Sequence, residues 1–310
     1  MKNKKVLVTG GAGFIGSHVV DGLIEGGHDV VILDNFRTGQ RANLNPAAKL
    51  YELSIQDGGL EELFSREKFD CVIHHAAQVS VIDSMANPME DAEINILGSI
   101  RVIEQCRKHK VKKFIYANSG GARTGEPQYL PVDEAHPALP ISPYGISKHT
   151  VEHYLFMYEK TEGFRYTSLN YANVYGPRQD PFGEGGVVAI FSRKMLDGKR
   201  PTIYGDGKQT RDFVYVKDLV RANLLALEKG DGESLNVGTG IETSVNDLFK
   251  ELKKITRFTG DAIYGPARSG EILRTYTKID RIRKGLGWQP ESSLSKGLAE
   301  TVESFSYARS

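Results

Sequence analysis

A tyrosine and a lysine four residues apart, Tyr144 and Lys148 in the stretch SPYGISK, are well suited to catalysis. On a helix, side chains at this spacing share one face. An ammonium group beside a phenol favours the phenolate, so we expect Lys148 to lower the pKa of Tyr144 from about 10. Such a pair could remove the proton of a substrate hydroxyl while a cofactor accepts a hydride.

The same spacing occurs a second time, at Tyr204 and Lys208 in YGDGK. The Gly-Asp-Gly between them is typical of a turn, in which the two side chains need not share a face. The spacing alone therefore cannot identify a catalytic pair. The helices, strands and turns that position each pair indicate which of the two is catalytic.

The first third of the chain predicts a parallel sheet covered by helices. Stretches with helical apolar spacing, such as FIGSHVVDGLIEGG, alternate with the apolar runs KKVLVTG, DVVILD, FDCVIHHAA and KKFIYANS, which are typical of buried strands. This alternation indicates an α/β fold with a Rossmann-type doubly wound parallel sheet. Further helices are predicted near 85–109 and over about 143–162.

After Pro177 the alternation weakens and the predicted elements become shorter. We therefore expect a Rossmann-type domain over residues 1–176 and a smaller C-terminal lobe over 177–310. The apolar segment ESLNVGTG is expected to return to the sheet.

The turn TGGAGFIG joins the first strand to the first helix. Gly10, Gly13 and Gly16 permit a tight turn and close approach of a pyrophosphate, and the helix N-terminus offers free N–H groups. Asp34 stands 18 residues beyond Gly16, where an acid bonds the adenosine ribose. A carboxylate there repels a 2′-phosphate and favours NAD over NADP, although Arg37 nearby weakens this preference.

The composition argues against several other classes of protein. A net charge of +1 gives no electrostatic reason to expect nucleic acid or a membrane surface as partner. No apolar run reaches the length of a signal peptide or a membrane span. Cys71 and Cys106 both lie in apolar segments, which argues against a disulfide framework and favours a cytoplasmic location. Cys71, His74 and His75 lie along one strand, whose neighbours face opposite sides, so no metal site is predicted.

Eight motifs together resemble the extended short-chain dehydrogenase/reductase family, in particular its nucleotide-sugar 4-epimerases of the UDP-glucose/UDP-galactose type. The resemblance runs nearly end to end and rests on TGGAGFIGSH, LDN, HHAAQ, NILGS, SPYGISK, YANVYGPRQ, RDFVYVKD and PARSGE. It implies Ser119 as an active-site hydroxyl beside Tyr144 and Lys148. It also implies that tightly bound NAD oxidises C4 of a UDP-sugar, that the 4-keto sugar rotates, and that the hydride returns to its other face.

The resemblance also implies where cofactor and substrate bind. The expected cofactor contacts are Gly10, Gly13, Phe14, Ile15, Gly16, Asp34, Asn35, Asp57, Ala76, Ala77, Gln78, Asn95, Tyr144 and Lys148. The expected substrate contacts are Asn173, Val187, Val188, Tyr204, Arg211, Arg268, Glu271 and Thr275.

Within the substrate set, Arg211 and Arg268 are expected to clamp the diphosphate, because guanidinium matches phosphate geometry. The helix that begins at Val187 offers its amides to the same group. Glu271 would hold the uridine ribose. The resemblance places Thr275, or else its neighbour Tyr276, where the family controls room for an N-acetyl group; the small Thr275 would leave that room, and we then expect UDP-N-acetylhexosamines to be accepted too.

Two glycines, Gly120 and Gly121, follow Ser119. Related sugar 4,6-dehydratases typically carry Asp-Glu there, and UDP-glucuronate decarboxylases carry Glu, to continue the chemistry beyond C4. The absence of an acid favours epimerisation.

The chain departs from the family pattern at several places. Arg123-Thr124 replaces the usual Val-Tyr or Ile-Tyr, and Asn170 stands where an arginine is often found. Arg123 could contact the substrate. Ser54 stands where an acid often follows the third strand, which leaves Asp57 as the expected contact.

Other functions remain open. These are 4-epimerisation of UDP-N-acetylglucosamine or UDP-glucuronate and, from another class, a non-catalytic dinucleotide sensor, although such sensors tend to lose the Tyr/Lys pair. The resemblance further implies galactose metabolism and a homodimer. Its four-helix interface would be built from the helices near 85–109 and 143–162, with Val151, Leu155 and Tyr158 as the apolar residues outside the catalytic face.

Overall fold

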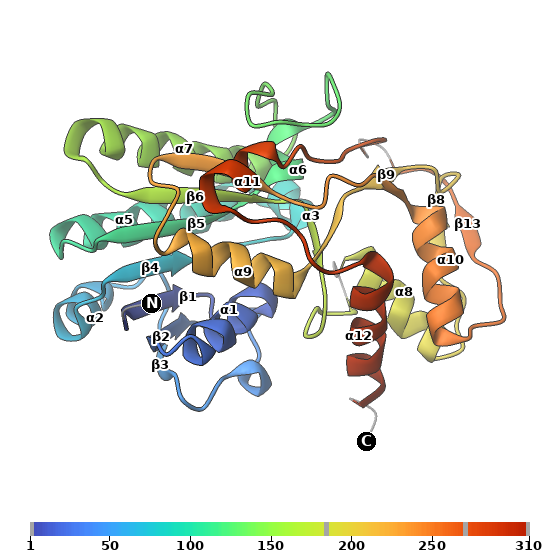
Figure 1. Cartoon of the computed structure of the whole chain (residues 1–310), viewed down its shortest axis with the longest axis horizontal. Coiled ribbons are helices and arrows are strands. Elements are labelled where there is room, and N and C mark those ends of the chain that lie inside the picture. Colours follow the sequence, from blue (N-terminus) through green and yellow to red (C-terminus); the bar gives the residue numbers. More distant parts are fainter. Residues whose placement is uncertain (1–2, 183–185, 269–271, 308–310) are drawn as a thin grey trace.

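The computed structural model describes residues 3–182, 186–268 and 272–307. Its centre is a seven-stranded parallel sheet in the order β11-β6-β5-β4-β1-β2-β3 (Figure 1). This confirms the predicted Rossmann-type α/β fold. The strands are β1 (Lys5–Thr9), β2 (Asp29–Asp34), β3 (Lys49–Glu52), β4 (Cys71–His74), β5 (Lys113–Ser119), β6 (Tyr166–Tyr171) and β11 (Glu233–Val237).

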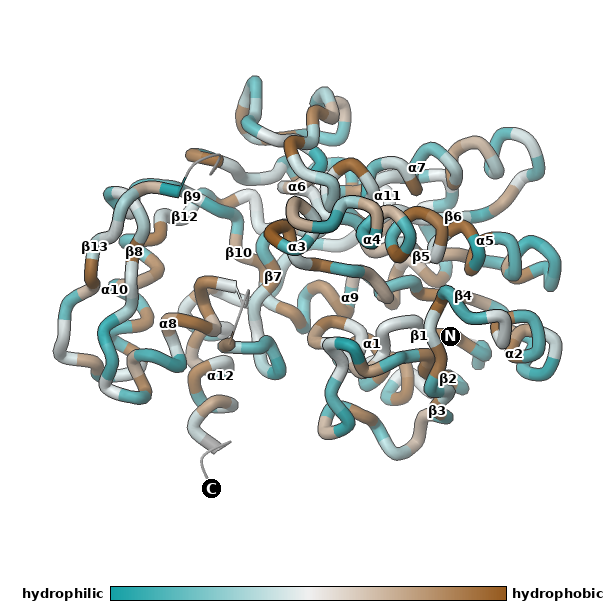
Figure 2. The backbone as a smooth tube through the Cα atoms, turned by 180° about the vertical axis from the view of Figure 1, so that it is seen from behind, coloured by the Kyte–Doolittle hydropathy of each residue, from teal (hydrophilic) through white to brown (hydrophobic). Residues whose placement is uncertain are grey.

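Nearly continuous apolar runs form the inner strands β1, β2 and β4, because helices cover both faces of the sheet. Hydrophobic colour follows the tube at β2 and β4 (Figure 2). Thr9 at the end of β1 lies opposite Leu33 of β2 and His74 of β4. This register brings the carboxyl ends of the strands to one edge of the sheet, where ligands bind in such folds.

Two helical layers enclose the sheet. One layer packs apolar residues of α1 (Phe14–Glu25), α9 (Val216–Ala226) and α11 (Asp280–Leu286) against it. The other layer contains α2 (Leu60–Glu67), α5 (Ser99–Lys108) and α7 (Pro143–Glu162). The stretch before α5 is helical in three pieces, α3 (Val81–Ala86), α4 (Pro88–Ala92) and the wider-turn segment η2 (Glu93–Gly98).

A separate apolar core holds the smaller part of the molecule together, on the right of Figure 1. Its elements are β7 (Asn173–Tyr175), α8 (Val187–Leu196), β8 (Thr202–Tyr204), β9 (Thr210–Arg211), β10 (Phe213–Tyr215), β12 (Thr243–Ser244), α10 (Val245–Thr256), β13 (Ile263–Gly265) and α12 (Leu294–Tyr307). The remaining short helices are η1 (Arg41–Asn43) and α6 (Gly120–Thr124). Because α9, β11 and α11 lie on the large sheet, residues 177–310 contribute to both parts.

Helix α7 has clear local signals at both ends. The Ser142 hydroxyl accepts the Gly145 backbone N–H at 3.1 Å, and Pro143 occupies the first turn. Gly163 ends the helix in the left-handed region, with φ 69°.

The expected role of two α7 residues was wrong. Val151 and Leu155 are fully buried in the core between α7 and the sheet, so they are not available for a dimer interface. The exposed apolar side chains of α7 are Ile146, Phe156 and Met157 instead. The periodicity indicated an apolar face but not which neighbour it packs against.

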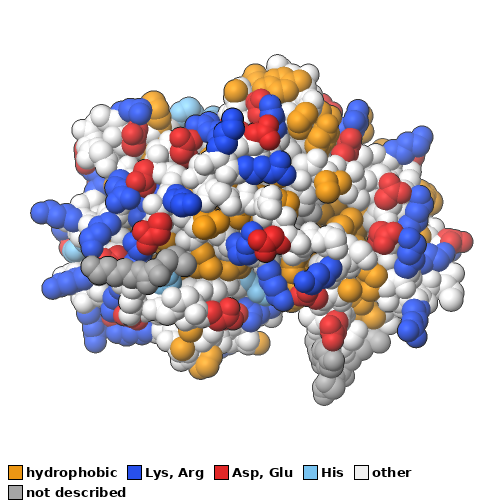
Figure 3. Space-filling view, viewed as in Figure 1, with side chains coloured by type: hydrophobic (Ala, Val, Ile, Leu, Met, Phe, Trp, Pro, Cys, Tyr) orange, Lys and Arg blue, Asp and Glu red, His pale blue; other side chains and the backbone are white. Residues whose placement is uncertain are grey.

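The surface carries mixed charge. Figure 3 shows acidic and basic side chains interspersed over one face, in line with the net charge of +1. Among the residues that the structure describes, no helix has the length and apolar character needed to cross a membrane.

Candidate active site

Two neighbouring elements bring together the three predicted catalytic residues. Ser119 ends β5 and caps α6, where its hydroxyl accepts the Ala122 backbone N–H at 3.3 Å. Tyr144 and Lys148 lie one turn apart on α7. A Cβ on Gly145 would lie 2.4 Å from the carbonyl oxygen of Ala122, so glycine is needed for α6 to contact α7. Ser119 hydrogen-bonds with Tyr144 across this contact.

The pKa of Tyr144 differs from the expectation. Burial raises it to about 12, against which the hydrogen bond with Ser119 acts. Burial also lowers the pKa of Lys148 to about 7, although the carboxylates of Asp91 and Glu152 act to raise it. The lysine therefore does not give Tyr144 a depressed pKa in this structure, because burial disfavours the charged forms of both groups.

Lys148 is held in a narrow polar and aromatic setting. Its Nζ lies 4.3 Å from the ring centroid of Tyr116, whose hydroxyl donates to the Lys148 carbonyl at 3.3 Å. The rival pair has no such setting. The side chain of Lys208 is 83% exposed and forms an ion pair with Asp206 in the turn.

A large cavity of about 850 Å³ runs beside Tyr144 along the carboxyl edge of the sheet. It is bounded by the glycine-rich turn and the ends of β2, β3 and β4. The predicted cofactor residues that line it are Gly10, Gly13, Phe14, Ile15, Gly16, Asp34, Asn35, Ala76, Ala77, Gln78 and Tyr144.

The glycine-rich turn makes a cradle that only glycine can form. Gly10 has φ +69°, and a Cβ there would lie 2.7 Å from the Ala76 backbone nitrogen. A Cβ on Gly16 would lie 2.1 Å from the Gly10 carbonyl oxygen. The backbone is thereby open to a pyrophosphate at the start of α1, as a bound dinucleotide requires.

Asp34 is positioned by the same turn. Its carboxylate accepts the Ala12 N–H at 2.9 Å and the Phe36 N–H at 2.8 Å. Each oxygen keeps capacity for a ribose hydroxyl. Arg37 forms an ion pair with Glu90 at 2.5 Å, which engages the one cation that weakened the predicted preference for NAD.

Two of the other predicted cofactor residues, Asn95 and Asp57, do not line the cavity. Asn95 accepts the Gln78 N–H at 2.8 Å and donates to the Gln78 carbonyl at 2.9 Å, so it fixes the loop after β4. Asp57 accepts the Ser54 N–H at 2.7 Å. Ser54 and Gln56, rather than Asp57, line the cavity.

Several lining residues were missed by the sequence reasoning, among them Thr38, Gln40, Asn43, Arg178 and Gln179. The last two belong to the motif YANVYGPRQ, which was a usable signal. Arg178 forms an ion pair with Asp21 of α1 at 2.8 Å, and so connects the segment after β7 to the first helix.

His74, the last residue of β4, and His75, which follows it, face opposite sides of the sheet. His74 lies between Thr9 Oγ1 at 2.7 Å and Ser99 Oγ at 3.0 Å, while His75 lines the cavity. Burial lowers the pKa of His75 to about 3, so the ring is neutral at physiological pH. Within the described ranges, no group of three His, Cys, Asp or Glu side chains could hold a metal ion.

The predicted substrate residues come from the smaller part and from the loops that join it to the sheet. Asn173 lines the cavity at the start of β7, and Val187 and Val188 begin α8. The Arg268 guanidinium lies 4.1 Å from the ring centroid of Tyr204. Arg211 donates to the carbonyls of Thr210 and Ile272, at 2.8 Å each.

The structure describes one of the two remaining predicted substrate residues, Thr275, but not the other. Thr275 is buried, with 8% exposure. Glu271 lies outside the described residues.

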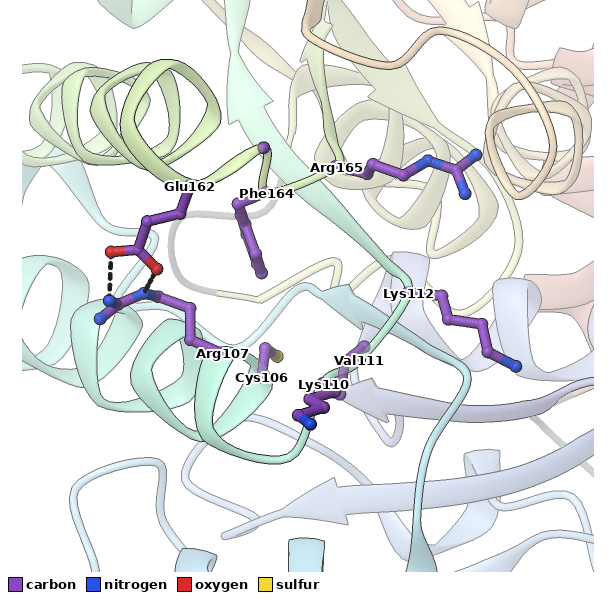
Figure 4. Close-up of a pocket in the computed structure, with 9 residues that line it drawn as sticks. Cys106, Arg107, Lys110, Val111, Lys112, Glu162, Phe164 and Arg165 are labelled. Atoms are coloured by element: carbon purple, nitrogen blue, oxygen red, sulfur yellow. Dashed lines mark hydrogen bonds and ion pairs between the residues drawn. The ribbon is translucent and has the colours of Figure 1, made fainter.

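A second, smaller hollow of about 280 Å³ lies at the opposite edge of the sheet (Figure 4). Its lining includes Arg107, Lys112 and Arg165, but their charges are engaged by Glu162, Asp70 and Asp231, respectively. Three of its four basic side chains are thus already engaged, and Lys110 is the fourth.

Comparison with known proteins agrees with this geometry. Residues 6–238 match the model of the NAD dependent epimerase/dehydratase family. A relative from Methanocaldococcus jannaschii, provisionally named UDP-glucose 4-epimerase, is 51% identical over 96% of this chain and 97% of its own.

Solved structures give the same result. The UDP-glucose 4-epimerase of Thermotoga maritima, crystallised with UDP-glucose, has a TM-score of 0.97 at 50% identity and covers 99% of this chain and 100% of its own. The Thermus thermophilus UDP-glucose 4-epimerase in complex with NAD has a TM-score of 0.93 at 39% identity, covering 98% and 99%. The chain therefore belongs to the NAD-dependent epimerase/dehydratase family.

Proposed function

We propose that this enzyme interconverts UDP-glucose and UDP-galactose by NAD-dependent epimerisation at C4. The observation that carries the proposal is the meeting of Ser119, Tyr144 and Lys148 beside a dinucleotide-sized cavity, with Gly120 and Gly121 in place of an acid. The relatives named as UDP-glucose 4-epimerases support it.

Each residue of the site has a separate role in the reaction. Tyr144 removes the proton of the sugar 4-hydroxyl and later returns it, and Ser119 hydrogen-bonds to the same sugar oxygen. Lys148, when protonated, stabilises the Tyr144 phenolate. Bound NAD supplies the hydride acceptor for C4 and the hydride donor for the return step. Asp34 and the glycine-rich turn would hold that cofactor through the whole cycle.

The substrate diphosphate would be held between the two parts of the molecule. Arg211 and Arg268 supply guanidinium groups, and the first turn of α8 supplies backbone N–H groups. Tyr204 would lie near the uracil ring, beneath Arg268. Binding the nucleotide in this way leaves the sugar near Tyr144, free to turn over.

The test is to incubate the purified protein with UDP-galactose and no added NAD. We expect UDP-glucose to form, because the cofactor would co-purify with the enzyme. UDP-N-acetylglucosamine and UDP-glucuronate, assayed in parallel, should turn over more slowly. A protein that binds NAD but converts none of these sugars would be a sensor, and the proposal would be wrong.

We further propose that the enzyme is a homodimer. Met89 of α4, Leu97 of η2, and Ile146 and Met157 of α7 are large apolar residues that remain exposed, by 38–76%. These helices pack against one another, so the residues lie on neighbouring elements and a second copy could cover them. Light scattering should give about twice the chain mass of 34.3 kDa, and a Met157→Glu variant should shift toward monomer. A cytoplasmic location and a role in galactose metabolism remain predictions.

A further inference from the structure

Glu152 is a buried carboxylate in the helix that carries the catalytic pair. It lies one turn beyond Lys148 and two turns beyond Tyr144, and its side chain is only 12% exposed. A buried carboxylate is costly unless it is both hydrogen-bonded and paired with a cation. Its partners therefore matter for the helix and for the charge around Lys148.

The sheet supplies Glu152 with neutral partners. Ser168 of β6 and Ser234 of β11 donate to Oε1 at 2.9 Å and 2.8 Å. Asn170, further along β6, donates to Ser234 at 3.0 Å and so holds that hydroxyl in place. These bonds satisfy one oxygen but bring no positive charge.

The cation comes from α6. Arg123 Nε lies 3.5 Å from Glu152 Oε2, and the Arg123 side chain is 14% exposed. Its Nη2 also lies 3.5 Å from the Glu134 carbonyl oxygen, so the guanidinium is turned toward the protein interior. His149, one turn before Glu152 on α7, hydrogen-bonds the same Oε2 at 3.0 Å.

This ion pair joins the two elements of the active site. Arg123 belongs to the short helix that Ser119 caps, and Glu152 belongs to the helix of Tyr144 and Lys148. The backbones of these helices already touch at Ala122 and Gly145. We propose, on the basis of the proposed epimerase activity, that Arg123 and Glu152 are positioning residues that fix Ser119 against Tyr144 and set the charge beside Lys148.

Arg123 acts electrostatically on Glu152, and Glu152 in turn acts on Lys148. The Glu152 carboxylate acts to raise the pKa of Lys148, and Arg123 lowers the pKa of Glu152 and partly offsets its charge. Burial alone would raise the pKa of Glu152, but the bonds from His149, Ser234 and Ser168 together with Arg123 outweigh it. The other titratable groups around the two sites are Asp91, His74, His75, Tyr116, Tyr144 and Tyr166.

The experiment compares Arg123→Met, Arg123→Lys, Glu152→Gln and the double variant Arg123→Met/Glu152→Gln. We expect kcat to fall about tenfold in Arg123→Met with little change in KM, and Arg123→Lys to recover most of it. The basic limb of kcat against pH should move up by about half a pH unit in Arg123→Met and down in Glu152→Gln. If the two residues had a merely structural role, the basic limb would not move in opposite directions in Arg123→Met and Glu152→Gln.

A matched control and an activity-independent readout complete the design. Arg107 on α5 forms ion pairs with Glu104 of the same helix and with Glu162 at the far end of α7. Arg107→Met removes both ion pairs and should leave kcat and the pH profile unchanged. At pH 8 the double variant should unfold at a higher temperature than Arg123→Met, because it removes the unpaired buried carboxylate.

Three results separate this inference from the proposed function. If Arg123→Met kept the kcat and the pH profile of the wild-type enzyme, the positioning role would be overturned. If only the KM of Arg123→Met rose, Arg123 would be a substrate contact instead. If the wild-type enzyme itself lacked epimerase activity, the proposed function would fail. The unfolding comparison would still decide whether the ion pair exists.

Discussion

At the scale of single residues, the neighbours of Tyr144 determine whether its hydroxyl can take part in proton transfer. The same residue types at Tyr204 and Lys208 lie in an exposed turn, whereas Tyr144 hydrogen-bonds with Ser119 and belongs to a helix on which Lys148 is buried. Replacing Tyr144 with Phe should lower kcat by roughly 10²–10⁴-fold while NAD content stays the same, because only the proton transfer is lost. Turnover assays should find Lys208→Met unaffected. Normal turnover in Tyr144→Phe would rule out the assignment.

Lys148 makes a second prediction at this scale. Burial lowers its pKa in the folded protein to about 7, from an ordinary value of 10.5, so the unfolded chain binds more protons between these two values. Stability must then rise with pH across this window, relative to Lys148→Met. Urea unfolding at pH 7 and pH 10 should show the difference between the two proteins changing by about 2–4 kcal/mol. A difference that does not depend on pH would mean that Lys148 keeps its ordinary pKa.

At the scale of elements, the glycine-rich turn depends on contacts that no side chain can share. A methyl group on Gly16 would meet the Gly10 carbonyl oxygen, so Gly16→Ala should shift the turn and weaken NAD binding at least tenfold. Gly58→Ala is the control, because nothing lies within 4 Å of a Cβ there. Calorimetric titration of NAD into the two cofactor-free variants would measure the effect, and equal affinities would contradict it.

Glu67 connects helix α2 to two strands of the sheet, β1 and β3. It ends α2 and forms ion pairs with Lys5 of β1 at 2.6 Å and Lys49 of β3 at 2.5 Å, and it accepts a hydrogen bond from Tyr51. The bonds from Lys49, Lys5 and Tyr51 lower its pKa to about 2. A depressed carboxylate pKa stabilises the fold above the unfolded pKa, and this contribution is lost as the pH falls through 2.

Glu67→Gln should therefore destabilise the protein by about 1–2 kcal/mol at pH 7, and the loss should vanish toward pH 2. Denaturant unfolding at several pH values measures this. Glu62→Gln, exposed on the same helix, should show no such pH dependence. A loss for Glu67→Gln that stays constant down to pH 2 would indicate a packing effect instead.

The sequence predicted the order of strands and helices better than it predicted their contacts. Strict alternation of apolar strands and helices, with glycines at one turn, is enough to predict the parallel sheet and its ligand-binding edge. Contacts between distant segments were not predictable. Val151 and Leu155 proved to be core residues because strands β5 and β6 lie beneath them, which periodicity cannot reveal.

The two departures from the family pattern show the same limit. Arg123 and Asn170 are 47 positions apart and looked unrelated in the sequence. In the structure both serve Glu152, one through its charge and the other through Ser234. The pKa of Tyr144 was missed for a related reason, because the degree of burial depends on the whole site.

At the scale of the whole molecule, the two parts have separate tasks. The sheet and its helices hold the catalytic residues and the dinucleotide cavity, while the smaller core carries the predicted substrate arginines. The boundary at residue 176 remains a prediction, since α9, β11 and α11 return to the large sheet. The sensor function is not favoured, because the Tyr/Lys pair is intact and the relatives are named as epimerases.

The central claim is that the hydrogen on C4 leaves and returns within one enzyme molecule. The most direct test is to supply UDP-galactose deuterated at C4, with no added NAD, and to follow the product by NMR. The account predicts UDP-glucose that keeps deuterium at C4, because the deuteride is stored on the bound cofactor and given back. Product whose C4 hydrogen comes from solvent, or a dehydrated product, would contradict it.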